Sequence, residues 1–283
     1  MGKLEEKLAN LSRNITQLER VVVAFSGGVD SSLVLKVAAD CLGKQNVLAV
    51  TVRSPLMPHR DLETAVRIAR ELQAPHRIIE TDELQDAQIV ANTPQRCYYC
   101  KRHTFELLTG LARREGYRSV LEGSNNSDTR DYRPGLAAVR SFEMVRSPLQ
   151  DCGLEKNEIR QIARLLGLKN WDRPARPCLA SRIPYGEPLS LEKLEMVDRA
   201  EDRLAGLGLK NVRVRYHGTV ARIEIDPDEM PGVLEPELLR QISREVKACG
   251  FTYVALDLDG YRTGSLNEVI GDEPESLKNV EKQ

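Results

Sequence analysis

The most constraining feature of this sequence is an apolar run that ends in a turn rich in glycine and serine. Val21 to Phe25 is β-branched and almost wholly apolar, as expected for a parallel strand covered on both faces. The turn Ser26-Gly27-Gly28-Val29-Asp30-Ser31-Ser32 follows, and Ser31 to Cys41 repeats apolar residues at helical spacing. A buried strand that leads through such a turn into a helix predicts an α/β fold.

The alternation of strands and helices continues along the first part of the chain. Strands that alternate with helices form parallel sheets with right-handed crossovers, and ligands bind at the carboxyl ends of the strands. We therefore expect residues 1–170 to form one α/β domain with a parallel sheet flanked by helices. Further strands are predicted at Val47 to Val52, His76 to Glu80, Ser119 to Gly123 and Glu143 to Val145. Helices are predicted at Met1 to Arg20, Asp61 to Leu72, Lys101 to Glu115 and Leu154 to Leu166.

The pattern changes near Trp171. Arg173 to Pro188 is rich in proline and has no periodicity, which indicates a linker or an active-site loop. The remainder mixes two predicted helices with three predicted strands, so we expect residues 171–272 to form a smaller α+β domain and residues 273–283 a flexible charged tail. The helices are Ser190 to Leu207 and Pro236 to Cys249, and the strands are Val212 to Tyr216, Val220 to Ile225 and Tyr253 to Leu258.

The turn after the first strand has the composition of an anion site. Two glycines let backbone N–H groups approach an anion, and the helix start adds the positive end of its dipole. Ser26, Ser31 and Ser32 supply further donors, while Asp30 fits such a site if it meets phosphate through Mg²⁺. The turn lacks the lysine of a Walker A motif and does not match the GxGxxG pattern, which argues against γ-phosphoryl transfer and dinucleotide binding.

Charge and hydropathy argue against several classes of partner. The formal net charge is -1, from 41 basic and 42 acidic side chains, which argues against nucleic acid or an anionic membrane as a partner. No run of about 18 apolar residues and no apolar region of a signal peptide is present. We therefore expect a cytoplasmic protein with reduced cysteines.

The cysteine spacing predicts metal binding or thiol chemistry. Cys97 and Cys100 form a CxxC pair just before the predicted Lys101 helix, and Cys178 lies far along the chain. Three thiolates can hold an iron–sulfur cluster with one iron open, Cys97, Cys100, Cys178 and His103 could bind zinc, and a CxxC pair can be a redox dithiol. Cys178 has arginines 173, 176 and 182 nearby in sequence, which would favour its thiolate and could bind an anionic substrate.

The turn Ser26 to Ser32 after an apolar strand resembles the PP-loop ATP pyrophosphatase superfamily, and the resemblance extends over Val21 to Gly167. Members cleave ATP between the α and β phosphates and pass AMP to an oxygen of the substrate. The resemblance implies that the loop binds pyrophosphate and that Asp30 holds Mg²⁺ and acts in catalysis. It also implies an ATP site formed by Ala24, Phe25, Ser26, Gly27, Gly28, Asp30, Ser31, Ser32, Thr51, Arg53, Gly123 and Asn125.

Three further segments narrow the resemblance to the LarE family of PP-loop sulfur transferases, which act in nickel-pincer nucleotide biosynthesis. They are Asp131 to Gly135, Pro177 to Gly186 and Leu256 to Ser265. The resemblance implies adenylation of a carboxylate of pyridinium-3,5-biscarboxylic acid mononucleotide, followed by attack of sulfur to give a thiocarboxylate and AMP. In one form of the family the cysteine that matches Cys178 gives up its own sulfur. Some members have these three cysteines, are similar to this chain and carry the sulfur on a [4Fe-4S] cluster, here implied at Cys97, Cys100 and Cys178.

The same resemblance implies the substrate site and the assembly. Substrate-binding positions are Ser181, Arg182, Glu201, Arg213 and Arg215, with Asp257 as a further polar candidate, and the family forms homo-hexamers as dimers of trimers. Arg213 and Arg215 alternate on one strand face, a pattern that a solvated face also shows. A tRNA thiolase of the same superfamily, an ammonia-using synthetase and a nucleotide-binding module with structural zinc are the rival interpretations.

Overall fold

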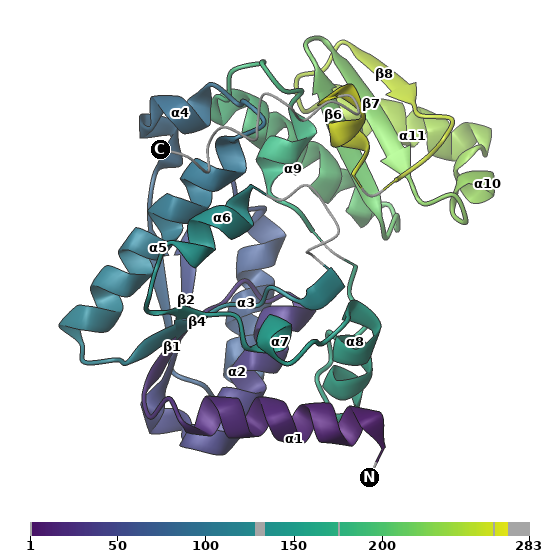
Figure 1. The fold of residues 1–283 in the computed structure, drawn as a ribbon. Helices are drawn as coiled ribbons and strands as arrows, with labels where there is room; N and C mark the ends of the chain where they lie inside the picture. The colour runs from purple at the N-terminus through teal and green to yellow at the C-terminus, as the bar shows by residue number, and fades with distance from the viewer. Residues whose placement is uncertain (1, 128–133, 175, 263, 271–283) are drawn as a thin grey trace. The chain divides into compact units, whose positions relative to one another are not determined.

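The computed structural model describes residues 2–127, 134–174, 176–262 and 264–270. The chain divides into two compact units, which we describe separately (Figure 1). Unit 1 comprises Met1–Glu83 and Gln95–Arg176, and unit 2 comprises Leu84–Pro94 and Pro177–Gln283. The predicted tail 273–283 lies outside the described residues, as do Asp131, Tyr132, Arg133 and Thr263 of the segments that resemble the LarE family.

Unit 1 is built on a five-stranded parallel sheet with the order β3-β2-β1-β4-β5. The apolar first strand lies at the centre because it pairs with strands on both sides, and its three valines are fully buried. The strand order reverses beside β1, which creates the topological switch point where α/β proteins bind ligands. The strands are β1 (Val21–Ala24), β2 (Val47–Arg53), β3 (His76–Glu80), β4 (Ser119–Leu121) and β5 (Val145–Arg146).

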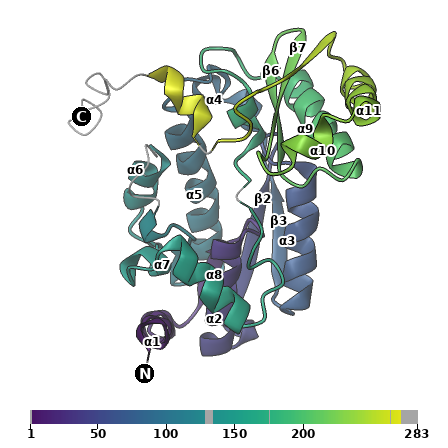
Figure 2. The ribbon, with the colours of Figure 1, turned by 90° about the vertical axis from the view of Figure 1, so that its right-hand side faces the viewer.

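Helices cover both faces of this sheet and enclose two apolar cores. The first core joins one sheet face to α1, α2, α3, α7 and α8, and the second joins the other face to α5 and α6. In Figure 2, α5 and α3 accordingly stand on opposite sides of β2 and β3. The predicted α/β class is confirmed. The helices are α1 (Lys3–Thr16), α2 (Val29–Leu42), α3 (His59–Glu71), α5 (Arg96–Arg114), α6 (Gly135–Arg140), α7 (Pro148–Asp151) and α8 (Lys156–Leu165), with the short turn η1 (Lys44–Asn46). The short turn η2 (Glu83–Gln85) spans the boundary between the two units in the sequence.

Several elements of unit 1 differ by a few residues from their predicted bounds, and the last strand and α5 are two of them. The last strand is Val145–Arg146, one residue beyond the predicted end. Helix α5 begins at Arg96 and not at Lys101, so the CxxC pair lies inside its first turns. Pro94 disfavours helix at the residue before it, but nothing between Arg96 and Lys101 interrupts one. The CxxC spacing suits a loop or a helix, and here it is helical.

Unit 2 is a small α+β unit with a three-stranded mixed sheet, as predicted. Strands β6 and β7 form an antiparallel hairpin, and β8 pairs parallel to β7. The predicted boundary did not anticipate that residues 84–94 join this unit. Asn92 holds them there, because its Nδ2 donates to the carbonyl oxygens of Pro184 at 2.8 Å and Glu187 at 3.0 Å. The elements are α4 (Ala87–Val90), η4 (Leu179–Arg182), α9 (Leu191–Gly206), β6 (Val212–His217), β7 (Val220–Ile225), α10 (Met230–Val233), α11 (Pro236–Lys247), β8 (Tyr253–Leu256) and η5 (Ser265–Ile270).

Membrane insertion through a helix has no support in the described part of the chain. Its helices are all too short or too polar to cross a bilayer.

Candidate functional site

The glycine- and serine-rich turn, which we call the phosphate loop (residues 25–32), joins the carboxyl end of β1 to the start of α2. Phe25 leaves the strand by donating its N–H to the carbonyl oxygen of Val50 at 2.9 Å. Gly123, just beyond β4, lies against the loop, because a Cβ there would stand 3.0 Å from the nitrogen of Ser31. The loop therefore lies at the switch point between β1 and β4, as the sequence predicts for a ligand site.

Gly27 is the residue on which the loop conformation depends. Its φ of 73° lies in the left-handed region, where a residue with a side chain is strained. A Cβ there would also stand 2.8 Å from the backbone nitrogen of Ala65 in α3. The loop therefore needs glycine for its conformation and for the close approach of α3.

The start of α2 presents a set of hydrogen-bond donors. The first intrahelical bond runs from the N–H of Ser32 to the carbonyl oxygen of Gly28, so the preceding N–H groups of the helix have no intrahelical acceptor. The hydroxyl oxygens of Ser26 and Ser31 lie 3.2 Å apart, and Ser26 Oγ accepts the N–H of Gly28 at 3.3 Å. These groups can turn together towards an anion at a helix N-terminus.

Lys156, at the first position of α8, brings a cation to this loop. Its Nζ lies 2.5 Å from Oδ2 of Asp30, and Asn125 Nδ2 approaches Oδ1 of the same carboxylate at 3.4 Å. The loop has no lysine of its own, and this one is 126 residues away in the sequence. Lys156 belongs to no motif of the sequence analysis, and only its helix-start position could have singled it out.

Asn170 is a second loop partner that no motif revealed. Its side chain is 4% exposed, and Nδ2 donates to the carbonyl oxygen of Gly27 and to Ser32 Oγ, each at 3.0 Å.

The predicted nucleotide contacts on β2 are already engaged within unit 1. The Thr51 hydroxyl donates to the carbonyl oxygen of Phe25 at 2.7 Å and contacts His76 Nε2 at 2.8 Å. Burial lowers the pKa of His76, which keeps the ring neutral beside the sheet. Arg53 is exposed and pairs with Glu80 at 2.7 Å. Thr51 therefore supports the end of β1, whereas Arg53 lies at the surface.

Cys97 and Cys100 lie three residues apart in α5 and so share one helix face. All six cysteines carry thiols, and these two are half-buried. Arg96 Nη2 donates to Cys97 Sγ at 3.7 Å, a neighbouring positive charge that suits a thiolate ligand. Gly135 packs beside this turn, since a Cβ there would lie 3.3 Å from the carbonyl oxygen of Cys97.

Cys178 lies in unit 2, immediately before η4, and is half-buried. Within the described residues, no group of three or more His, Cys, Asp or Glu side chains could hold a metal ion. The arginines near Cys178 in sequence pair with carboxylates, Arg173 and Arg176 with Asp61 and Arg182 with Glu201. The thiols of Cys97 and Cys100 in α5 thus suit two ligands of a cluster. That Cys178 completes the ligand set is a proposal.

Unit 2 joins Cys178 to the predicted substrate residues through a buried ion pair. Arg182, 1% exposed, makes two bonds of 2.8 Å to Glu201 and also donates to the carbonyl oxygens of Pro177 and Cys178 at 2.6 and 3.0 Å. Ser181 Oγ donates to the same Cys178 carbonyl at 2.8 Å. The ion pair therefore fixes the backbone that carries the thiol.

The two arginines of β6 are buried, which rules out a solvated strand face. Arg215 is 7% exposed, and it makes bonds of 2.9 and 2.7 Å to Glu224 and donates to the Ser181 carbonyl at 2.6 Å and to Ser265 Oγ at 3.0 Å. Arg213 stacks 4.9 Å from the ring centre of Tyr261. Two of the three segments that resemble the LarE family, Pro177 to Gly186 and Leu256 to Ser265, thus meet in unit 2. Asp257 instead pairs with Arg222.

The network lowers the pKa of Glu201. Burial alone would raise its pKa, but the charge and hydrogen bonds of Arg182, the charge of Arg213 and the N–H of Val214 together lower it. Glu201 is therefore ionised at neutral pH.

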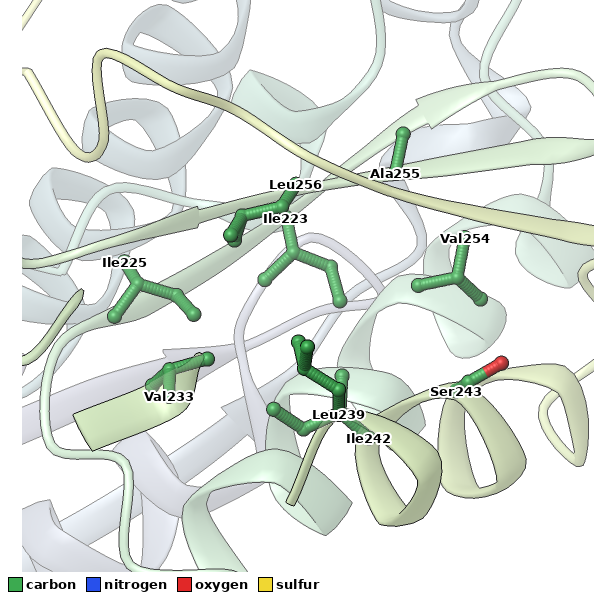
Figure 3. A pocket seen from close by; sticks show the side chains of 9 residues that line it. All are labelled: Ile223, Ile225, Val233, Leu239, Ile242, Ser243, Val254, Ala255 and Leu256. Atoms are coloured by element: carbon green, nitrogen blue, oxygen red, sulfur yellow. The ribbon is translucent and has the colours of Figure 1, made fainter. Parts of the chain in front are cut away.

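A pocket of about 240 Å³ lies elsewhere in unit 2, between the sheet and α11 (Figure 3). Its lining is apolar, with Ile223 and Leu256 on the strands facing Leu239 and Ile242 on the helix. Ser243 is its one hydroxyl, and no charged side chain lines it. It does not have the chemistry to hold a nucleotide phosphate.

Comparison with known proteins shows which family this chain is similar to. The NAD synthase family model matches residues 3–99, which include the phosphate loop. The chain is 44% identical to the uncharacterized protein slr1717 of Synechocystis over 94% of this chain and 99% of that protein. It is 40% identical to the pyridinium-3,5-bisthiocarboxylic acid mononucleotide synthase of Lactiplantibacillus plantarum over 95% of this chain and 97% of that protein.

The parallel sheet and its phosphate loop define an ATP-using protein of the PP-loop class. The Lactiplantibacillus plantarum synthase is similar to this chain over almost its whole length, which narrows the assignment to one family within this class. The chain belongs to the family of the pyridinium-3,5-bisthiocarboxylic acid mononucleotide synthase, the LarE family of PP-loop sulfur transferases. The predicted family and enzyme class are confirmed, whereas the individual site residues stay predictions.

Gly27→Ala should destabilise unit 1 by about 2–4 kcal/mol, because the new Cβ meets α3 and the residue stays at positive φ. Chemical denaturation followed by circular dichroism measures the change. Gly110→Ala, inside α5, is the matched control and should be neutral or stabilising by up to about 1 kcal/mol. Equal effects would show that the close approach of Gly27 is unimportant.

Glu201→Gln should destabilise the protein by about 3–5 kcal/mol at pH 7, because it leaves the buried charge of Arg182 without its counter-charge. The lowered pKa of Glu201 means that its contribution is present above the ordinary value of 4.5 and is lost as pH falls through the folded value. The difference between variant and wild type should therefore shrink in acid. Glu245→Gln, which breaks a surface pair with Arg203, should change stability little at any pH.

Proposed function

We propose that this protein uses ATP to adenylate a carboxylate of pyridinium-3,5-biscarboxylic acid mononucleotide and then converts it to a thiocarboxylate. The observation that carries the proposal is a phosphate loop of helix-start N–H groups and serine hydroxyls, with Lys156 supplied from α8. The named activity of the 40% identical relative supports the substrate. Pyridinium rings with two carboxylates and a phosphate are the substrate class.

In the first step a carboxylate oxygen attacks the α-phosphorus of ATP, and the bond to the β-phosphate oxygen breaks. The products are an acyl adenylate and pyrophosphate. The loop donors and Lys156 stabilise the negative charge on the departing pyrophosphate. Asp30 would hold Mg²⁺, which neutralises phosphate charge when bound. Lys156 then exchanges its contact with Asp30 for a phosphate oxygen.

In the second step a sulfur nucleophile attacks the carbonyl carbon of the adenylate and the bond to AMP breaks. One sulfide equivalent is consumed, and one thiocarboxylate, one AMP and one proton are released. A carboxylate oxygen is a poor leaving group, whereas AMP leaves readily, so adenylation makes the substitution feasible. Buried Arg213 and Arg215 with Ser181, Arg182 and Glu201 are the proposed substrate side.

We propose that the sulfur is carried by a [4Fe-4S] cluster with Cys97, Cys100 and Cys178 as ligands. The support is a pair of thiols on one face of α5 and a third thiol on a backbone fixed by Arg182. Held by these three cysteines, a cluster would have one iron without a protein ligand, and that iron would supply a site for sulfide. A cytoplasmic location and a homo-hexamer built as a dimer of trimers are part of the same proposal.

With ATP, Mg²⁺ and the dicarboxylate substrate, the protein should release AMP and pyrophosphate. Lys156→Met should lower kcat roughly 10²- to 10³-fold, because a cation that stabilises the leaving group is lost. Lys36→Met removes a comparable lysine–carboxylate pair on the exposed side of α2 and should retain activity. Chromatography of the nucleotides measures both. Release of ADP and orthophosphate would contradict the proposed adenylation.

Anaerobic purification should yield about four irons per chain, and Cys97→Ser, Cys100→Ser or Cys178→Ser should each lower iron and multiple turnover together. Cys41→Ser changes another half-buried thiol and should leave both unchanged. Iron analysis and the intact mass after turnover provide the readout. An iron-free protein that works once and loses the elements of hydrogen sulfide from Cys178 would instead assign the sulfur to that cysteine. Salt-sensitive retention of tRNA would favour the thiolase alternative.

A further inference from the structure

Asn170 combines deep burial with incomplete hydrogen bonding. Its Nδ2 serves Gly27 and Ser32, but Oδ1 is buried without a hydrogen-bond partner. A buried acceptor without a partner disfavours the folded state, and an apolar side chain of the same shape would avoid that cost. The amide is therefore poorly explained by stability alone.

The position of the carbonyl oxygen of Gly27 explains the orientation of the amide. If the side chain were turned over, Oδ1 would face the carbonyl oxygen of Gly27, and two acceptors would oppose each other. The donor face of Asn170 must therefore point at the loop. The hydrogen bonds donated by Nδ2 are therefore what asparagine contributes at this position.

This contact also sets the direction of the next N–H group. A trans peptide is planar, so the carbonyl of Gly27 and the N–H of Gly28 point in opposite directions. When Asn170 holds the carbonyl, the N–H of Gly28 is turned away from Asn170, to the side where it meets Ser26 Oγ at 3.3 Å. Ser26 and Ser31 lie on that side and are 3.2 Å apart at their hydroxyls.

The same amide also reaches the first turn of α2. Ser32 is fully buried, its Oγ accepts from Asn170, and its N–H makes the first intrahelical bond to Gly28. One side chain thus holds the peptide before the helix and the residue that closes its first turn. The donor groups between these two points lose the freedom to turn away from an anion.

We propose that Asn170 is a positioning residue for the phosphate loop, which presets the Gly27–Gly28 peptide and the start of α2 for binding pyrophosphate. The inference rests on the proposed function in that it takes pyrophosphate as the ligand of the loop. Asn170 acts through Gly27 and Ser32 and does not touch the nucleotide. Preset donors avoid reorganisation when the anion arrives.

The test compares two variants with wild type in the full-length protein. Asn170→Leu keeps the shape and removes the donor, and Asn170→Asp keeps the shape but sets a carboxylate against the carbonyl oxygen of Gly27. Affinity for inorganic pyrophosphate with Mg²⁺, measured by calorimetry, should fall about 10- to 100-fold in Asn170→Leu and further in Asn170→Asp, because a small displacement of preset groups costs this much. KM for ATP should rise while KM for the acid substrate stays unchanged.

Asn46→Leu is the matched control. Asn46 Nδ2 donates to the carbonyl oxygen of Leu42 at 2.8 Å, at the opposite end of the same helix. Thermal unfolding reports the stability of both leucine variants, and only Asn170→Leu should lose pyrophosphate affinity. Should Asn170→Leu fail to fold, Asn170→Asp provides the same measurement.

The outcomes separate this inference from the proposed function. Wild-type affinity for pyrophosphate in both Asn170 variants would overturn the positioning role while leaving AMP formation intact. A parallel rise of both KM values, or an equal loss of affinity in Asn46→Leu, would also overturn it, since general destabilisation then suffices. A wild-type protein that binds pyrophosphate yet forms no AMP would contradict the proposed function and not the role of Asn170.

Discussion

The close contact between Gly27 and the backbone of Ala65 is the constraint on which unit 1 depends. No Cβ fits between the loop and α3, so only glycine lets this helix pack against the turn. Ala65 and the start of α2 belong to one apolar core, and the first N–H groups of α2, as at any helix start, have no intrahelical acceptors. Core packing and anion binding therefore use one short segment, which explains why the motif is compact in sequence.

Unit 2 is organised by buried charge. A buried ion pair contributes little net stability compared with apolar packing, but removing one partner is costly. The pairs Arg182–Glu201 and Arg215–Glu224 therefore act mainly by fixing the orientation of the two guanidinium groups. Each guanidinium also donates to a carbonyl oxygen in the segment around Cys178. Residues that resemble substrate binders thus first support the backbone of the thiol. A substrate bound here would have to accept hydrogen bonds from N–H groups of these arginines that the ion pairs do not use.

Local pattern predicted the fold and the contiguous half of the site, because alternating strands and helices and the turn Ser26 to Ser32 are properties of neighbouring residues. The other half has no such signal. Lys156 and Asn170 meet their loop partners across 126 and 143 residues, and each looks like a surface residue in its own segment. Burial of Arg215 was equally hidden, since the alternation along β6 does not reveal that Glu224 of β7, which is in register with Arg213, forms an ion pair with Arg215.

The origin of Lys156 bears on the type of phosphate chemistry. In a Walker loop the lysine moves with the loop that wraps the phosphates. Here it starts α8, which packs in the same core as α2, so helix packing and not the loop sets where the cation can reach. Its present partner is Asp30, so the charge near the loop is balanced before any nucleotide arrives. In the proposed reaction, phosphate and magnesium would take over the two halves of this half-buried ion pair, so that neither charge would be left without a partner. A loop of neutral donors beside such a pair suits a ligand that arrives with its own cation and departs as pyrophosphate.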